Sequence, residues 1–271
     1  MLPVTGDGTA GFPGGTGVTR INVYTWDAVD GQCGGSPHLH TATTESYVVV
    51  AGRGRVQTLS STGFDEHPLA PGTVLWFTPG TVHRLINDDG ALEIVAVMGN
   101  SGLPENGDAV LTFPDRYLND PETYRRAAAL PSEGTAAAKE AAVVARRDLA
   151  MEGFLALRSR LETEGPQALD HLHRQAAALI QDKVATWTAL VRNGPLAQAQ
   201  QSLEQLERLA VGDGTHLSRA VVRSAAPTSS DPVYGMCGRL QTWNLMPATG
   251  ETGNAAGADR RGNPVIVSKN Q

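Results

Sequence analysis

Cysteine is scarce in this chain, with only Cys33 and Cys237 among 271 residues. The two lie far apart in sequence and neither belongs to a C-x-x-C pair, which argues against a disulfide framework and against a thiolate zinc cluster. We interpret Cys33 as a structural residue. Two free cysteines suit a reducing compartment, and we therefore expect a cytoplasmic protein.

Positive charge is also limited, since 22 Lys and Arg face 28 Asp and Glu and the formal net charge is −6. Nucleic acids and anionic membrane surfaces attract proteins through a basic field, so we expect neither as a partner. The most apolar windows, 47–51 and 92–98, are too short to cross a hydrocarbon core of about 30 Å. Residues 1–17 lack the basic and apolar regions of a signal peptide.

What the chain does have is a strand-like first half. Over residues 19–113, short runs of Val, Ile, Thr, Trp and Tyr alternate with turn residues at intervals of about 8 to 12 residues. No helix-length pattern interrupts them, which argues against βαβ units and favours a sandwich or a small barrel. The predicted strands are 20–24, 45–50, 54–59, 72–77, 83–87 and 92–97.

Residues 135–210 are instead rich in Ala, Leu, Glu and Arg, with apolar positions three and four apart, which predicts helices. The first helix should end near Gly165, the second should stop at the Asn-Gly-Pro of 193–195, and the third should run over 196–210. Each apolar stripe needs a partner surface. We therefore expect a bundle of about three helices, or helices packed on the β-domain.

The sequence thus predicts an α+β chain in five parts. These are a flexible N-terminal arm over 1–18, a β-barrel over 19–115, a helical region over 116–213, returning strands on the barrel over 214–246, and a flexible C-terminal tail over 247–271. The returning strands are expected at 217–223 and 240–245.

Three histidines and a glutamate stand where strands can bring them together. Because side chains alternate in an extended segment, His38 and His40 share one face, and Glu45 opens the next strand. His83 follows a Pro-Gly turn at the start of another strand. Three imidazoles and one carboxylate suit Fe, Mn, Ni, Cu or Zn and leave positions open for water or substrate. We predict one divalent transition metal held by His38, His40, Glu45 and His83.

The same residues carry a resemblance to the cupin superfamily. Its two motifs are matched here, in the family's spacing, by His38, His40, Glu45 and Gly52 and by Gly72, Gly80, His83 and Asn87. Two turn positions depart from the family pattern, Gln32 in place of Gly and Thr78 in place of Pro. The resemblance covers about residues 19–113 and implies a jelly-roll-like double-stranded β-helix with a mononuclear 3-His-1-Glu metal. It explains nothing in the helical half.

The resemblance further implies a metal-dependent enzyme acting on a small organic molecule. Quercetinase-type dioxygenases, sugar-phosphate isomerases, decarboxylases and polyketide cyclases share this pattern. It also implies that Glu45 shuttles a proton. Tyr47 has the strand parity of Glu45 and is our second catalytic candidate.

We favour a dioxygenase-like oxidoreductase with an apolar or aromatic substrate, because the strand residues expected to face inward are apolar. They are Tyr47, Val49, Leu85, Ile94 and Met98. A phosphosugar site would need several inward cations, and the nearby ones are Arg53, Arg55 and Arg84.

Alternatives stay open: a sugar isomerase or cyclase, or a non-catalytic ligand-binding or sensing cupin. The helices are interpreted as a cover over one barrel end or a dimer interface, or as a lid. The family resemblance implies a homodimer, and the excess of Arg over Lys indicates a bacterial source. His67, in a polar turn, is a weak ligand candidate. His171 and His173 are two residues apart on a helix and point in different directions.

Overall fold

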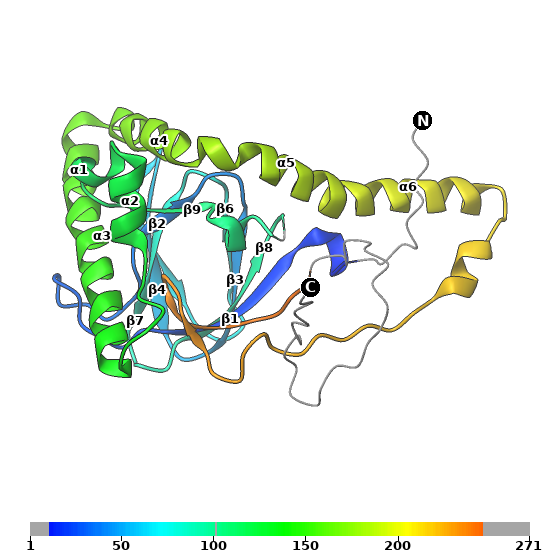
Figure 1. Cartoon of the computed structure of the whole chain (residues 1–271), viewed down its shortest axis with the longest axis horizontal. Helices are drawn as coiled ribbons and strands as arrows, with labels where there is room; N and C mark the ends of the chain where they lie inside the picture. Colours follow the sequence, from blue (N-terminus) through cyan, green and yellow to red (C-terminus); the bar gives the residue numbers. More distant parts are fainter. Residues whose placement is uncertain (1–10, 101, 246–271) are drawn as a thin grey trace, which may run out of the picture. The chain divides into compact units, whose positions relative to one another are not determined.

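A computed structural model describes residues 11–100 and 102–245 of the chain. The α+β class is confirmed, because strands fill the first half and helices follow (Figure 1). The expected C-terminal tail and most of the expected N-terminal arm lie outside the described residues. The five-part division therefore stays a prediction.

The larger sheet of the barrel has six antiparallel strands. In spatial order they are β10 (Val233–Tyr234), β11 (Gly238–Thr242), β1 (Gly17–Val23), β8 (Glu93–Met98), β3 (Glu45–Ala51) and β6 (Val74–Phe77). Strands β1, β3, β6 and β8 were predicted. Strand β11 overlaps the returning strand expected at 240–245 and extends the sheet by pairing with β1.

The smaller sheet has five antiparallel strands. In spatial order they are β5 (Gly63–Leu69), β4 (Gly54–Ser60), β7 (Val82–Asn87), β2 (His38–His40) and β9 (Ala109–Leu111). Strands β4 and β7 were predicted, whereas β5 was not, because its sequence is polar and contains Pro68. A strand at the edge of a sheet tolerates both features.

The two sheets face each other across a shared apolar core. Tyr47 and Ile94 of the larger sheet belong to one buried cluster with Val56 and Leu85 of the smaller sheet. Strand alternation decides which side chains join this core. In β6, for example, Phe77 is 9% exposed and its neighbour Trp76 is 68% exposed.

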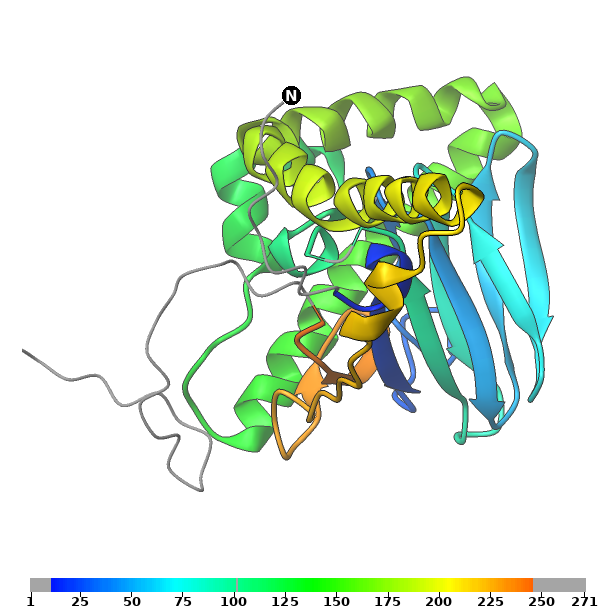
Figure 2. The ribbon, with the colours of Figure 1, turned by 90° about the vertical axis from the view of Figure 1, so that its right-hand side faces the viewer.

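Four helices follow the barrel and cover the outer face of the smaller sheet. They are α1 (Asp115–Leu118), α2 (Pro121–Ala128), α3 (Ala136–Glu164) and α4 (Gln167–Ile180). A second core joins Leu39 of β2 with Phe154 of α3 and Leu172 of α4. Figure 2 shows the helices of this region, in green, beside the strands. At Gly153, an added Cβ would lie 2.0 Å from the carbonyl oxygen of Thr112. A glycine at this position therefore lets α3 lie directly on the backbone of residues 112–113.

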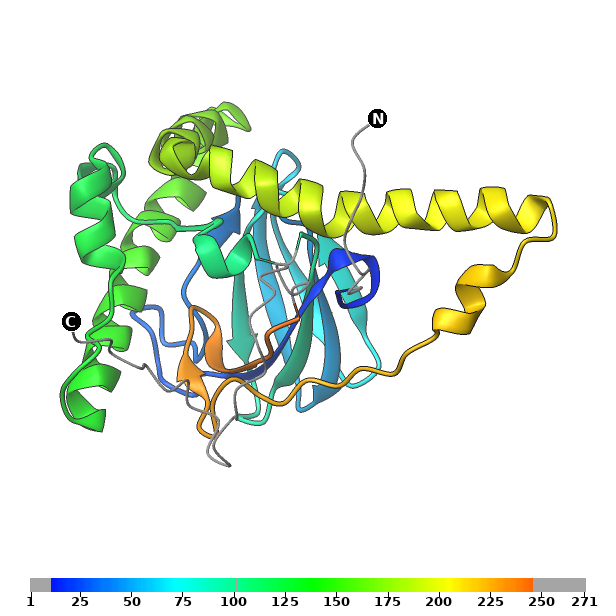
Figure 3. The same ribbon diagram turned by 45° about the vertical axis from the view of Figure 1, so that its right-hand side comes forward.

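The helix that was expected to stop at 193–195 continues. After α4 come the 3-10 turn η3 (Gln181–Lys183), α5 (Val184–Val191), the π-helical turn η4 (Arg192–Leu196) and α6 (Ala197–Ala210). The elements η4 and α6 prolong α5 without a break in the ribbon (Figure 3). Pro195 lies inside the π turn, whose wider spacing accommodates a residue without an N–H. The predicted stop was wrong for this reason.

The apolar stripe of α6 is exposed. Leu203 and Leu206 are 56% and 61% exposed, and no residue of this fully described helix is buried. Its contacts are with η4 and with the 3-10 turn η1 (Pro13–Gly15). The expectation that every stripe is buried is therefore wrong for α6, because no element within the described residues covers its leucines.

The strand expected at 217–223 is also a wrong prediction. Residues 215–219 form the 3-10 turn η5 (Thr215–Arg219), and Val222 is fully exposed. A β-branched run becomes a strand only where another strand pairs with it.

A further 3-10 turn, η2 (Pro104–Asn106), precedes β9. Within the described residues, no helix combines the length and the apolar character needed to span a membrane.

Candidate metal centre

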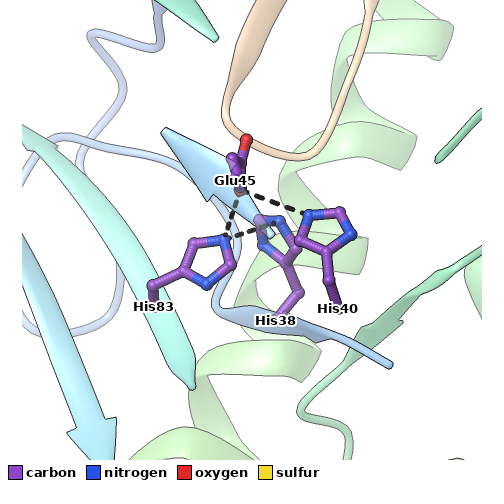
Figure 4. Close-up of side chains that lie close together, drawn as sticks. All are labelled: His38, His40, Glu45 and His83. Carbon is purple, nitrogen blue, oxygen red and sulfur yellow. Dashed lines mark hydrogen bonds and ion pairs between the residues drawn. The ribbon is translucent and has the colours of Figure 1, made fainter. Parts of the chain in front are cut away.

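The four predicted ligands come from three strands and meet inside the barrel. Strand β2 carries His38 and His40, β3 begins at Glu45, and His83 of β7 pairs directly with His38 in the sheet register. Their exposed fractions are 3%, 6%, 3% and 0% for His38, His40, Glu45 and His83. One ligand-type atom from each lies within 4.8 Å of every other (Figure 4). The structure therefore brings together the residues that sequence spacing selected.

The backbone sets the tautomers of two of the histidines. His38 Nδ1 lies 2.9 Å from the Ser36 carbonyl oxygen, and His83 Nδ1 lies 3.0 Å from the Thr81 carbonyl oxygen. A carbonyl oxygen only accepts, so each Nδ1 donates a proton and each neutral ring presents a lone pair at Nε2. The two Nε2 atoms are 3.1 Å apart. Two lone pairs at this separation repel each other unless a cation lies between them.

A carboxylate completes the donor set. Glu45 Oε2 lies 3.2 Å from His40 Nε2 and 3.1 Å from His83 Nε2. This oxygen is buried and has no well-aligned hydrogen bond among the described residues. A divalent transition metal accepts such nitrogen and oxygen donors. The residues present therefore fit the metal that the sequence predicts.

The charges inside the cluster are uneven. Burial by itself would lower the pKa of His40, but the adjacent carboxylates of Asp108 and Glu45 outweigh burial and raise that pKa to about 9. Burial likewise opposes the charge of Glu45, yet the contacts with His40 and His83 hold its pKa well below the usual value. Burial and the two neighbouring imidazoles lower the pKa of His38. Without a metal, His40 therefore holds a proton more readily than His38 does.

Asp108 is a supporting residue that sequence reasoning missed. Its buried carboxylate lies 3.2 Å from His40 Nδ1. It also accepts backbone N–H bonds from the next three residues, at 3.1 Å from Thr41, 2.8 Å from Ala42 and 3.1 Å from Thr43. One side chain therefore orients the His40 ring and shapes the turn that leads to Glu45. Its signal in the sequence is a lone aspartate before the apolar run 109–111.

Tyr47 lies inside the barrel next to the cluster. It is fully buried, and its hydroxyl makes no well-aligned hydrogen bond among the described residues. Its ring centroid is 5.3 Å from that of Phe77 and 6.4 Å from that of His83. Burial, with Glu45 nearby, raises the pKa of Tyr47 well above its usual value. The hydroxyl is therefore protonated at neutral pH.

The other candidate residues lie elsewhere. His67 lies on β5 and contacts Thr58, while His171 pairs with Asp115. His173 donates to the Gly80 carbonyl oxygen at 2.9 Å and so ties α4 to the turn before His83.

The arginines near the barrel are engaged elsewhere. Arg84 donates to Asp30 at 2.6 Å, and Arg55 pairs with Glu66 and Asp88. Among the described residues, neither guanidinium hydrogen-bonds or ion-pairs with the cluster. Cys33 donates to Asp27 in a loop outside the barrel.

Residues 26–98 match the family model described as the cupin domain. The barrel carries a cupin domain. The family match contains all four cluster residues and ends before the helices, as the sequence resemblance predicted. Among curated proteins, none matches the chain.

Several solved structures resemble part of this chain. The Streptomyces nucleoside dehydratase Pac13, determined with uridine, is 18% identical and has a TM-score of 0.24, and the match covers 31% of this chain and 58% of Pac13. WlaRA, a TDP-fucose-3,4-ketoisomerase from Campylobacter jejuni, is 7% identical with a TM-score of 0.29. QdtA, a sugar 3,4-ketoisomerase from Thermoanaerobacterium thermosaccharolyticum in complex with TDP, is 11% identical with a TM-score of 0.29. Each of these two matches covers 34% of this chain and 64% of the other. The match thus spans less than two thirds of each neighbour.

Proposed function

We propose that this protein is a metal-dependent cupin enzyme that acts on a small organic molecule. The observation that carries the proposal is the buried convergence of His38, His40, Glu45 and His83, with the outer nitrogen of each imidazole held by an oxygen. These four residues would hold one divalent ion of Fe, Ni, Mn, Cu or Zn. Bound there, the ion would polarise a substrate oxygen or, if it is redox-active, support chemistry with O2.

Two side chains of the cluster region would handle protons. Glu45 offers an ionised carboxylate, and Tyr47 offers a protonated hydroxyl. Both are at most 3% exposed, so bulk water does not compete with a substrate for them. Exclusion of water also strengthens the electrostatic interactions of these groups.

The first candidate reaction is dioxygenase-like oxidation of an apolar or aromatic substrate. The apolar residues predicted to face inward, such as Val49, Leu85 and Ile94, are buried in the barrel core. Arg55 and Arg84 are engaged with carboxylates. A phosphorylated substrate would find neither guanidinium free, which favours an uncharged substrate.

A second candidate is isomerase or cyclase chemistry. The proximity of the Tyr47 hydroxyl to the Glu45 carboxylate favours it, because the two would act as an acid and a base beside the metal. Such a reaction requires a Lewis acid but no oxygen.

The first test is the metal content of the purified protein, measured by inductively coupled plasma mass spectrometry. We expect about one equivalent of a transition metal in the wild type and none in the double variant His38→Ala/His83→Ala. His67→Ala is the matched control, since it removes an imidazole outside the cluster. A wild type that stays metal-free after reconstitution would overturn the enzyme proposal and favour a ligand-binding protein.

The second test separates the two reactions. Oxygen consumption with phenolic and flavonoid-like substrates, absent in His83→Ala, supports the dioxygenase. Substrate conversion without oxygen consumption, with deuterium incorporated from heavy water, supports the isomerase or cyclase. Saturable binding without conversion identifies a non-catalytic cupin.

We also propose a cytoplasmic homodimer. Its support is the edge strand β6, where Val74 and Trp76 are 57% and 68% exposed, because sheet edges in proteins are generally paired or covered. Light scattering coupled to size-exclusion chromatography should give twice the 28.5 kDa mass of the chain. A monomer at all concentrations would contradict this.

A further inference from the structure

The tip of the β10–β11 hairpin lies beside the metal cluster, although it comes from a distant part of the chain. Cys237, at this tip, is 4% exposed and belongs to the same core cluster as Tyr47. The hairpin, drawn in pale orange, passes beside Glu45 (Figure 4). Burial, with the Glu45 carboxylate nearby, raises the pKa of the Cys237 thiol well above its usual value. The β10–β11 hairpin therefore places a thiol beside the cluster.

The tip is held from several directions. The Gly235 carbonyl oxygen accepts from Arg146 Nη2 of α3 at 2.7 Å and from the Tyr24 hydroxyl at 3.2 Å. The Met236 carbonyl oxygen accepts from the Ser36 N–H at 2.8 Å. An added Cβ at Gly35 would lie 2.7 Å from Cys237 Cα, so the close approach requires a residue without a side chain. These contacts keep the position of the thiol constant.

Two buried hydroxyls lie in this part of the barrel. Tyr47 Oη and Ser36 Oγ both belong to fully buried residues, and neither makes a well-aligned hydrogen bond among the described residues. Ser36 has the strand parity of His38, which points into the barrel, and it bonds to the hairpin next to Cys237. Buried polar groups are normally paired, so these two hydroxyls beside the candidate catalytic centre are available to pair with a ligand.

We propose that Cys237, Tyr47 and Ser36 form a polar subsite beside the metal cluster that binds a hydroxyl or carbonyl oxygen of an uncharged substrate. The three groups are a thiol and two hydroxyls, all of which can donate a hydrogen bond. The guanidinium of Arg146, which lies near Cys237, is engaged with the carbonyl oxygens of Ala128 and Gly235. The subsite therefore selects oxygen functions without a negative charge. This inference rests on the proposed metal function, because the substrate must reach the metal and the subsite together.

The test uses Co²⁺-loaded protein and acetamide, a small oxygen donor that stays uncharged. Binding is followed by the visible absorption of cobalt. We expect the dissociation constant of the probe to rise about tenfold, the effect of one lost hydrogen bond, in each of Cys237→Ala, Tyr47→Phe and Ser36→Ala. The cobalt content should stay unchanged. Cys33→Ala is the matched control and should bind like the wild type. Cys237→Ser keeps a donor and should retain affinity within about threefold.

The outcomes separate this inference from the function on which it rests. Full cobalt loading with unchanged probe affinity in all three alanine or phenylalanine variants refutes the subsite alone. A cobalt–thiolate charge-transfer band in the wild type that disappears in Cys237→Ala also refutes it, because the thiol would then be a metal ligand. Failure of the wild type to bind cobalt refutes the metal site and the subsite with it. If Cys237→Ala does not fold, Tyr47→Phe and Cys237→Ser still decide the question.

Discussion

Strand β2 is buried on both faces, whereas most of the surface of helix α6 is exposed. The three residues of β2 are 1% to 6% exposed, with the two histidines inside the barrel and Leu39 under the helices. In α6, Leu203 is 56% exposed although it belongs to an equally regular apolar stripe. The comparison teaches that burial requires a partner surface, and that the short strand between two cores is where stability and function coincide.

The largest expected effect comes from truncating the covered leucine. Leu39→Ala should lower the free energy of unfolding by about 2 to 5 kcal/mol, because it leaves a cavity between the smaller sheet and α3. Urea denaturation measures the loss. A change of less than about 1 kcal/mol would show that the helices pack loosely on β2 and would break the comparison.

Asp108 tests whether support for the ligands in β2 is as important as their burial. Asp108→Asn should weaken metal affinity by about 10- to 100-fold, because an amide cannot accept every hydrogen bond that the carboxylate accepts from His40 and the 41–43 turn. Competition with a chelator measures the affinity. Asp65→Asn, on the exposed side chain of β5, is the matched control. An affinity within about twofold of the wild type would contradict the positioning role.

The proton on His40 predicts a pH dependence for the metal-free protein. The pKa of His40 is raised in the folded state to about 9, from 6.5 in the unfolded chain. Its contribution to stability is therefore complete below pH 6.5 and is lost as the pH rises through about 9. The pKa of His38 is lowered, so His38 stays neutral over this interval.

The measurement is the free energy of unfolding in the presence of a chelator, compared with His40→Gln across about pH 6 to 10. The advantage of the wild type over the variant should shrink as the pH rises. A difference that stays constant, or grows, would contradict the sign of the His40 shift.

The smallest effect is expected in α6. Leu203→Ala makes the same truncation as Leu39→Ala but should change the free energy of unfolding of the monomer by less than about 0.5 kcal/mol, because the side chain is already in water. The two variants measured together at low protein concentration sharpen the comparison. A loss of more than about 1 kcal/mol would mean that α6 is covered in solution.

Much of the candidate site follows from local spacing. His38 and His40 share a face because side chains alternate, and Glu45 and His83 each stand near the start of a strand that the composition predicts. Asp108 could not be found in this way. It lies far from His40 in the sequence and contacts it only because β9 pairs with β2. Pro195 was misread for a related reason, since whether a proline ends a helix depends on the width of the turn around it.

The sequence by itself determined the α+β class, most of the strands, the long helix α3 and the donor set of the cluster. These features depend on alternation, helical periodicity and ligand chemistry, which act over a few residues. The tertiary structure alone decided which apolar stripes are buried, that Asp108 supports His40, and that Cys237 comes to lie beside Tyr47. Each of these depends on contacts between segments far apart in the chain, and local propensity carries no information about such contacts.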